Sequence, residues 1–135
     1  MAFEQTRCEL VAGLLIVRIA DMKILLIKRS KLVNLPGFWA IPGGKVEFGE
    51  PQIEAALREG EEELGCLPWD LQVEEIPAVC DDCAICFSVF LGTTQDCDWK
   101  PVINWESDQW GWFDVRKLPY PLMTCNLEVI EELLC

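Results

Sequence analysis

Apolar and polar residues follow two different periods along the chain, and each period predicts one kind of element. Five apolar runs of strand length, rich in β-branched and aliphatic residues, span residues 10–19, 24–28, 71–79, 84–91 and 110–114. The first two predict a hairpin with one face in the core. Apolar residues recur at the helical period of about 3.6 over residues 51–64 and 126–134, which predicts a central and a C-terminal helix.

The order of these elements predicts an α/β protein with helices on two faces of a mixed sheet. The C-terminal helix should turn Leu127, Ile130, Leu133 and Leu134 toward the core. The segment 30–44 contains Pro-Gly and Pro-Gly-Gly, which predict a loop. A length of 135 residues predicts one domain, residues 1–135, and an apolar share of 51% is typical of a folded core rather than of disorder.

Three glutamates of the central helix, Glu59, Glu62 and Glu63, lie within one helical turn, because positions three and four apart are neighbours. Like charges this close destabilise an isolated helix, so the arrangement needs a compensating partner. A hard divalent cation held by carboxylate oxygens is such a partner. The alternative is a solvated acidic face, as surface helices commonly have.

The spacing around these glutamates is long and strict. It runs Gly44, five residues, Glu50, seven residues, Arg58-Glu59, Glu62-Glu63 and Gly65. This pattern resembles the Nudix box, G-x5-E-x7-R-E-U-x-E-E-x-G-U with U apolar, of the Nudix hydrolase family and its MutT-like members. Two positions depart from it: Gly60 stands where the family has a bulky aliphatic residue, and Cys66 is a small occupant of the last apolar position. Gly60 should cost the helix about 1 kcal/mol relative to Ala and weaken the packing behind the glutamates.

The resemblance implies a Nudix-type α/β/α sandwich, with the Nudix helix at about 51–64, and a catalytic Mg2+ that Mn2+ can replace. The metal ligands that it implies are Gly43, Glu59, Glu62, Glu63 and Glu106. Glu106 is included because it lies six residues before Trp112, as a metal-site glutamate does in MutT; the alternative is a plain loop carboxylate. The general base stays open among Glu59, Glu63 and Glu106. Arg58 is expected to pair with Glu50 or to brace the glutamates.

Candidate substrate-binding residues lie in three segments. Arg29 closes the second predicted strand, either as its polar end or as a phosphate contact, since the family often has a basic residue near this point. Gly44 lets the backbone approach a ligand closely, and Lys45 follows with a charge suited to phosphate. Asn126 lies in a segment similar to the one whose Asn recognises the nucleobase in MutT, and an Asn offers a donor and an acceptor to one base edge. Its alternative role is the N-cap of the C-terminal helix.

The eight cysteines raise the question of a second metal site. Cys80, Cys83 and Cys86 form a C-x2-C-x2-C run, with Cys97 as a conceivable fourth ligand. The flanks do not form two C-x2-C pairs and the chain has no His, which argues against a zinc or iron–sulfur site. We expect these cysteines to act as small apolar residues with mostly reduced thiols, rather than as metal ligands or disulfides.

Charge and hydropathy narrow the range of partners and cellular locations to expect for the protein. The net charge of −12 argues against a nucleic-acid polymer as partner, because binding to a phosphate backbone needs Lys and Arg surfaces. It leaves room for a small nucleotide that arrives with magnesium. No run resembles a signal peptide or a membrane span, so we expect a cytoplasmic protein without membrane contact. The sequence leaves monomer and homodimer open.

The predicted function is the magnesium-dependent hydrolysis of a nucleoside diphosphate linked to another group. A nucleoside or deoxynucleoside triphosphate cleaved to monophosphate and pyrophosphate is the favoured case. The alternatives are a nucleotide-sugar or dinucleoside-polyphosphate hydrolase and, in other classes, a non-catalytic nucleotide-binding module or a small cysteine–metal protein.

Overall fold

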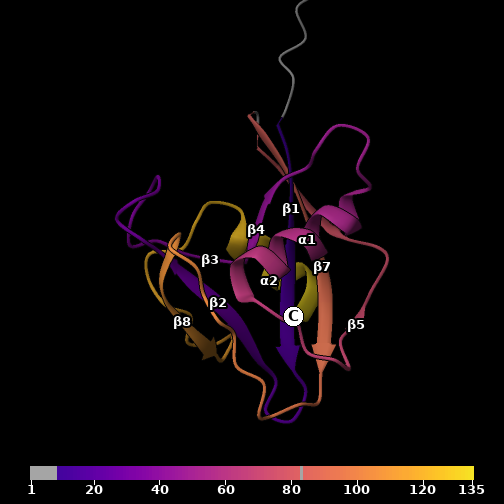
Figure 1. Ribbon diagram of the computed structural model, residues 1–135, viewed down its shortest axis with the longest axis vertical. Coiled ribbons are helices and arrows are strands. Elements are labelled where there is room, and N and C mark those ends of the chain that lie inside the picture. The colour runs from indigo at the N-terminus through magenta and orange to yellow at the C-terminus, as the bar shows by residue number, and fades with distance from the viewer. Residues whose placement is uncertain (1–8, 83) are drawn as a thin grey trace, which may run out of the picture.

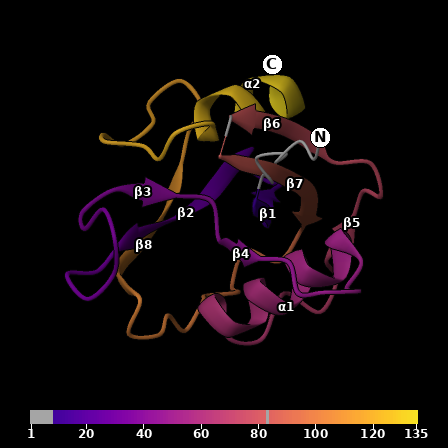
Figure 2. The same ribbon diagram turned by 90° about the horizontal axis from the view of Figure 1, so that it is seen from above.

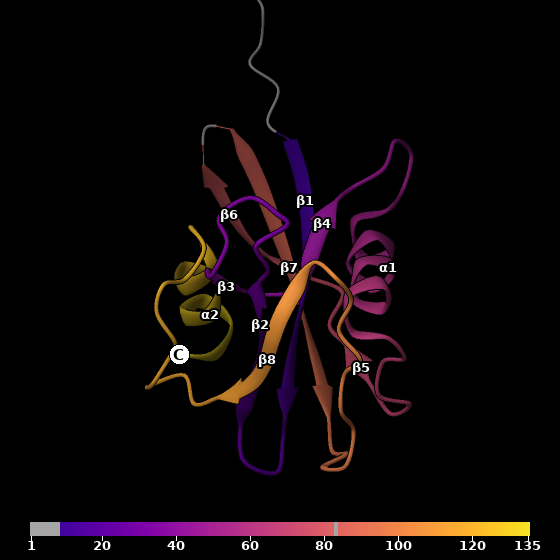
Figure 3. The ribbon, with the colours of Figure 1, turned by 60° about the vertical axis from the view of Figure 1, so that its left-hand side comes forward.

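The computed structural model describes residues 9–82 and 84–135, which form one mixed sheet between two helices (Figure 1). The strands are β1 Glu9–Arg18, β2 Lys23–Arg29, β3 Trp39–Ala40, β4 Gly43–Lys45, β5 Gln72–Val73, β6 Ala78–Asp82, β7 Ile85–Thr94 and β8 Ser107–Phe113. The helices are α1 Gln52–Leu64 and α2 Asn126–Leu134. Seen from the side, α1 and α2 cover opposite faces of the sheet (Figure 3). The predicted α/β/α sandwich is therefore confirmed.

The main path of the sheet runs β3-β2-β1-β7-β5, and β1 and β7 are its parallel pair. The central strand β1 changes partner along its length. Its C-terminal end pairs with β2, where Val17 faces Ile24, whereas its first half pairs with β4. β1 and β2 therefore diverge from their hairpin, as Figure 1 shows, and the short strands β3 and β4 enter the opening. Functional residues from both halves of the chain meet at this fork.

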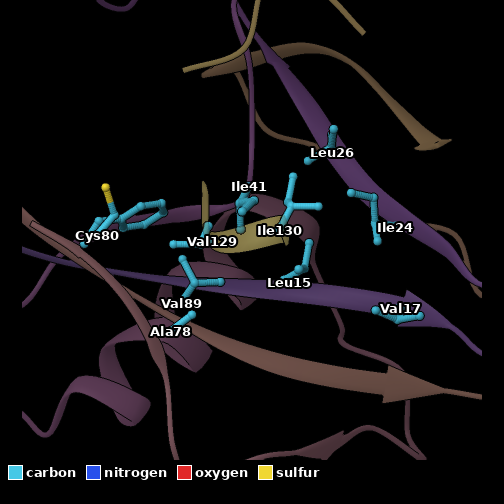
Figure 4. Packing of buried hydrophobic residues seen from close by; sticks show 11 residues of the cluster. Leu15, Val17, Ile24, Leu26, Ile41, Ala78, Cys80, Val89, Val129 and Ile130 are labelled. Atoms are coloured by element: carbon cyan, nitrogen blue, oxygen red, sulfur yellow. The ribbon is translucent and has the colours of Figure 1, made fainter. Parts of the chain in front are cut away.

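The sheet is buried on both faces because side chains alternate along its strands. Leu14 and Ile16 of β1 pack with α1, whereas Leu15 and Val17 pack on the other face. That second core contains Val89 of β7 and the α2 residues Val129 and Ile130, which are seen together in Figure 4. Both helices are thus fixed to the sheet by apolar packing. Among the described residues, neither helix combines the length and the apolar character needed to cross a membrane.

Several boundaries differ from the sequence-based expectation. The run 71–79 is not one strand: it is divided into β5 and β6 by the segment that ends in Pro77, and β6 then continues through Cys80. The segment 30–44 is not wholly a loop, because β3 and most of β4 lie in it and pair with β2 and β1. The C-terminal helix has its predicted bounds, but Leu127 is 48% exposed and Val129 takes the buried position, since α2 is rotated to bury Asn126.

Candidate active site

Helix α1 begins after Pro51, which holds its N-cap position, and ends at Gly65, whose positive φ of 77° favours a residue without a Cβ. Its three glutamates are not equivalent. The Glu63 side chain is buried, Glu59 is mostly buried, and the Glu62 side chain is 54% exposed. The helix therefore turns Glu59 and Glu63 inward, toward β4, and leaves Glu62 at the rim.

The two inward carboxylates rest on the glycines of β4. The backbone N–H of Gly43 donates a hydrogen bond of 2.8 Å to Glu63 Oε2. A Cβ atom at Gly44 would meet the carboxylate of Glu59, which is the end of a flexible side chain, whereas a Cβ atom at Gly43 would collide with the backbone of β1 at Ala12 and Gly13. Gly43 therefore requires glycine because β4 lies so close to β1, and the bare Gly44 leaves Glu59 its place against the strand.

Arg58 organises the outer side of the same cluster. Its guanidinium donates to both oxygens of Glu50, at 2.8 and 3.0 Å, and to Glu59 and Glu62 at 3.1 and 3.3 Å. A further bond of 3.0 Å goes from Arg58 Nη2 to the carbonyl of Lys45. The bidentate pair lowers the pKa of Glu50 and raises that of Arg58. Arg58 therefore fulfils both predicted roles, since it pairs with Glu50 and braces two glutamates.

Electrostatics mark Glu59, Glu63 and Glu106 as one group. Burial and then the charge of Glu59 raise the pKa of Glu63 to about 8, and Glu106 contributes in the same direction. Burial and then the charge of Glu62 raise the pKa of Glu59, with Glu106 again adding to the effect. Glu106 lies in the loop before β8, where its backbone N–H donates to Asn104 Oδ1 at 2.9 Å. The distant glutamate singled out by its spacing to Trp112 is thus brought to the helix.

The cluster has donors that suit a divalent cation, since they are hard carboxylate oxygens, although among the described residues the oxygens of Glu59, Glu63 and Glu106 are not gathered into a closed ligand set. Burial first, and then the charges of neighbouring glutamates, raise the pKa values of Glu59 and Glu63, and the cations near them do not cancel this effect. Among the described residues, Arg58 lies on the outer side, and Arg29 is the cation whose charge lowers the pKa of Glu63. A divalent ion bound to Glu59, Glu63 and Glu106 would supply the missing positive charge.

Lys45, one of the predicted phosphate contacts, is placed differently from the other candidates. Its side chain is 80% exposed, and its Nζ lies 3.0 Å from Glu9 at the start of β1. The structure records no contact between Lys45 Nζ and the described carboxylates of α1. A phosphate role would require Lys45 to leave Glu9, whereas Arg29 already faces the cluster.

On the α2 side of the fork lies a cavity of about 250 Å³. Its walls come from segments that are distant in sequence and include Arg29, Ile41, Gly43, Phe87, Met123 and Asn126. Arg29 and Gly43 belong to the cavity and also act on Glu63, so the cavity and the carboxylate cluster adjoin at these two residues. A ligand that filled the cavity would have its charged end near Arg29.

Asn126 is buried in the wall of this cavity. Its Oδ1 accepts a hydrogen bond of 2.7 Å from the backbone N–H of Ile41, and its Nδ2 donates to the carbonyl of Thr124 at 3.2 Å. The N-cap position belongs to Cys125, so the proposed capping role of Asn126 is wrong. One amide hydrogen and one acceptor site of Asn126 remain beyond these two bonds.

The sequence profile of the NUDIX domain matches residues 9–133. The chain belongs to the Nudix family. Among the relatives of this Nudix chain, 8-oxo-dGTP diphosphatase of Proteus vulgaris is 34% identical over 82 residues, which are 57% of this chain and 66% of that protein. The m7GpppN-mRNA hydrolase NUDT17 of Xenopus laevis is 49% identical over 51 residues, 37% of this chain and 17% of that protein. The chain thus spans less than two thirds of the length of either relative.

The fold of this Nudix chain also matches a solved structure along its length. The MutT NUDIX hydrolase from Burkholderia pseudomallei is 30% identical, with a TM-score of 0.68 over 93% of this chain and 97% of the other.

Among the cysteines that the structure describes in this Nudix chain, Cys80, Cys86 and Cys97 are not gathered into the metal site that their spacing suggested. Cys80 is joined by a disulfide to Cys125. Cys97 lies after the C-terminal end of β7, whereas Cys86 is near the start of that strand. Cys86 is free on β7, and Cys83 lies outside the described residues. The expectation that these thiols are reduced is therefore wrong for Cys80, because the fold brings it to a partner 45 residues away.

Sequence reasoning missed the apolar part of the cavity. Ile41, Phe87 and Met123 belong to separate segments and read individually as core or loop residues. Their only shared signal is position in the fold: all three border the fork between β1 and β2. Glu63 was found, but its burial was not, since that depends on the approach of β4 rather than on helical spacing.

Proposed function

We propose that this chain hydrolyses a nucleoside diphosphate linked to another group, and that a nucleoside or deoxynucleoside triphosphate, cleaved to monophosphate and pyrophosphate, is its substrate. The observation that carries the proposal is the electrostatic coupling of Glu59, Glu63 and Glu106, next to Arg29 and Gly43, which also line a mainly apolar cavity. Family membership and the spacing of the Nudix box support the same chemistry.

The carboxylates have a defined task in this proposal. Glu59, Glu63 and Glu106 hold a divalent cation, Mg2+ or Mn2+ in its place, with Glu62 available at the rim. A divalent ion held by these residues would supply positive charge to neutralise the phosphates and a coordinated water of lowered pKa. One carboxylate of the group accepts the proton of the attacking water; the general base stays open among Glu59, Glu63 and Glu106, because a bound cation would itself lower the pKa values of its ligands. Arg58 is a positioning residue, since its bonds to Glu50 and Glu59 fix the outer side of the group.

The cavity supplies the substrate's orientation. Its apolar walls, formed by residues such as Phe87 and Ile41, suit a flat nucleobase, and its few polar groups can select among bases. Asn126 holds that wall through Ile41 and keeps a free donor and acceptor for the base edge. Arg29 then contacts the phosphates between the base and the cation.

A nucleotide panel tests the proposal. Nucleoside triphosphates, nucleotide sugars and dinucleoside polyphosphates are incubated with the protein, with and without Mg2+, and released pyrophosphate and monophosphates are quantified. We expect Mg2+-dependent turnover with at least one triphosphate, and the position of ¹⁸O from labelled water identifies the attacked phosphorus. Hydrolysis of the sugars or dinucleotides alone would favour the alternative substrates, and a flat panel would favour a nucleotide-binding module.

Metal binding is tested separately from turnover. Because a ligand that binds only the folded state stabilises it by about 2.7 kcal/mol at a hundredfold excess over its Kd, Mg2+ should raise the thermal midpoint. The rise should be lost in Glu59→Gln and kept in Glu54→Gln, a matched change at an exposed glutamate of the same helix. An equal rise in both variants would place the cation elsewhere.

A further inference from the structure

A disulfide joins strand β6 of the sheet to the residue that directly precedes helix α2. Cys80 lies in β6, at the edge of the sheet, and Cys125 directly precedes α2. Figure 2 shows α2 beside β6, which is a strand of the sheet, on the side away from α1. Cys80 belongs to the apolar core under the helix, near Val129 (Figure 4), whereas Cys125 lines the cavity next to Asn126. The bond thus connects the core to the cavity wall.

Cys125 occupies a conformation that the bond helps to hold. Its φ of 73° lies in the left-handed region, which a residue with a Cβ seldom adopts. The next residue is Asn126, whose Oδ1 holds the backbone N–H of Ile41 on the facing wall. Release of Cys125 would therefore free the first turn of α2 and, through Asn126, the position of Ile41.

The surroundings of the bond suit reversible reduction. Cys80 is only 7% exposed, whereas Cys125 is partly exposed and lines the cavity, so Cys125 is the more accessible of the two cysteines to an attacking thiolate. A carboxylate oxygen of Glu128, one turn into α2, lies 3.1 Å from Cys80 Sγ. After reduction it can accept the S–H of Cys80, which gives the buried thiol a partner.

We propose that Cys80 and Cys125 form a redox pair that controls the ligand cavity: the disulfide form holds the cavity in its binding shape, and the dithiol form loosens it. Oxidation joins the two sulfurs, and their two protons and two electrons pass to a small-molecule disulfide, which becomes two thiols. Reduction by a small dithiol reverses the exchange. The carboxylate cluster on the α1 face takes no part in either step.

Linkage makes the effect reciprocal. If the oxidised form binds a cavity ligand more tightly by some factor, then the ligand shifts the thiol–disulfide equilibrium toward the disulfide by the same factor. A ligand in the cavity also covers the sulfur of Cys125, so it should slow reduction as well. The nucleotide-binding test described next rests on the proposed function, whereas the thiol-labelling and hydrogen-exchange tests do not.

The experiment compares the oxidised protein, the protein reduced with dithiothreitol, and Cys80→Ala, which cannot form the bond and keeps the buried site apolar. Cys97→Ser, at an exposed cysteine in a loop, is the matched control and should behave as the wild type. Binding of the nucleoside monophosphate product of the best panel substrate is measured without Mg2+. Reduction should weaken binding at least about threefold, the loss expected if a third or less of the molecules keep the competent cavity. Cys80→Ala should bind weakly in both conditions.

Two further measurements keep the inference separate from the proposed function. Thiol labelling under denaturing conditions should show two more reactive cysteines after reduction, and amide exchange should speed up at residues 123–127 but not in α1. If the panel finds no nucleotide, these two results still decide whether the bond holds the wall. Equal affinity and equal exchange in both redox states would overturn the proposal. Stoichiometric Zn2+ binding by the reduced wild type that is lost in Cys80→Ala would also overturn it, by making Cys80, Cys125 and Glu128 a metal site.

Discussion

The two faces of the sheet carry opposite chemistry. The α1 face gathers Glu59, Glu63 and Glu106 with Arg58 in a charged network, whereas the α2 face encloses an apolar cavity with a single buried amide, Asn126. The faces meet at the fork between β1 and β2, where Arg29 and Gly43 belong to both. The division separates reaction from recognition. Substitutions on the α1 face should change rate, and those on the α2 face should change which ligand is preferred.

The largest effect should come from Glu63→Gln, which removes a charge from the centre of the α1 face. Gln keeps an oxygen acceptor for Gly43 N–H, so the fold should survive, while turnover should fall at least about 100-fold, equal to about 2.7 kcal/mol of transition-state stabilisation. Steady-state pyrophosphate release measures the loss. Glu61→Gln, an exposed glutamate of the same helix, should retain wild-type turnover. Near-normal rates in Glu63→Gln would show that the buried carboxylate is structural.

The next effect tests whether Arg58 acts through geometry or through charge alone. Arg58→Lys keeps the positive charge but cannot reproduce the bidentate contact with Glu50, so kcat should fall about 10-fold and more Mg2+ should be needed for half-maximal rate. Arg116→Lys is the matched control, because Arg116 makes a similar pair with Asp114 at 3.0 Å on the exposed surface. A magnesium dependence unchanged in Arg58→Lys would argue against a positioning role.

The α1 face could be predicted because its information is local. A helical period fixes the angular positions of Glu59, Glu62 and Glu63, and the spacing of Gly44 and Glu50 places the loop that precedes them. The spacing could not predict how deeply each glutamate side chain is buried. Glu63 is buried and Glu62 is exposed because β4 lies against one flank of the helix, and that contact depends on the pairing of β4 with β1.

The α2 face could not be predicted in the same way because its residues are distant in sequence. The helix itself follows from its apolar period, but Ile41, Phe87 and Asn126 meet only after the strands are ordered. The bond between Cys80 and Cys125 spans 45 residues, and no local pattern indicates it. Asn126 was singled out by family resemblance, and the structure supplies the contact with Ile41 that the resemblance lacked.

Substitutions at two asparagines, one on each face of the sheet, compare the roles of the two faces most directly. Asn126 holds Ile41 N–H on the α2 face, and Asn104 holds Glu106 N–H and the carbonyl of Glu62 on the α1 face, each bond being 2.7–2.9 Å long. Either change to Ala should cost about 1–2 kcal/mol of stability, since buried or half-buried backbone groups lose partners. Asn126→Ala should reduce discrimination between bases by about threefold to tenfold, the equivalent of one hydrogen bond.

Asn104→Ala, in contrast, should lower kcat and leave the ranking of bases as it is, because it loosens Glu106 and not the cavity. Specificity constants for the same four nucleotides, measured on both variants, provide the comparison. If both variants lost the same property, the division between a reacting face and a recognising face would be wrong.

The smallest effect concerns the inner side of α1, at Gly60. The sequence predicts that this glycine weakens packing, but Gly60 is buried, and a Cβ there would lie 3.0 Å from Leu14 Cδ2, so Leu14 already fills the space. Gly60→Ala should gain about 1 kcal/mol of helix propensity and lose part of it as Leu14 moves, so the free energy of unfolding should change by less than about 1 kcal/mol.

Gly60→Leu should lower the free energy of unfolding by about 1–3 kcal/mol through overpacking, as measured by urea unfolding. It should also lower turnover, because lifting α1 from β1 draws Glu63 away from Gly43. A stabilised and fully active Gly60→Leu would mean that Leu14 does not set the height of the helix.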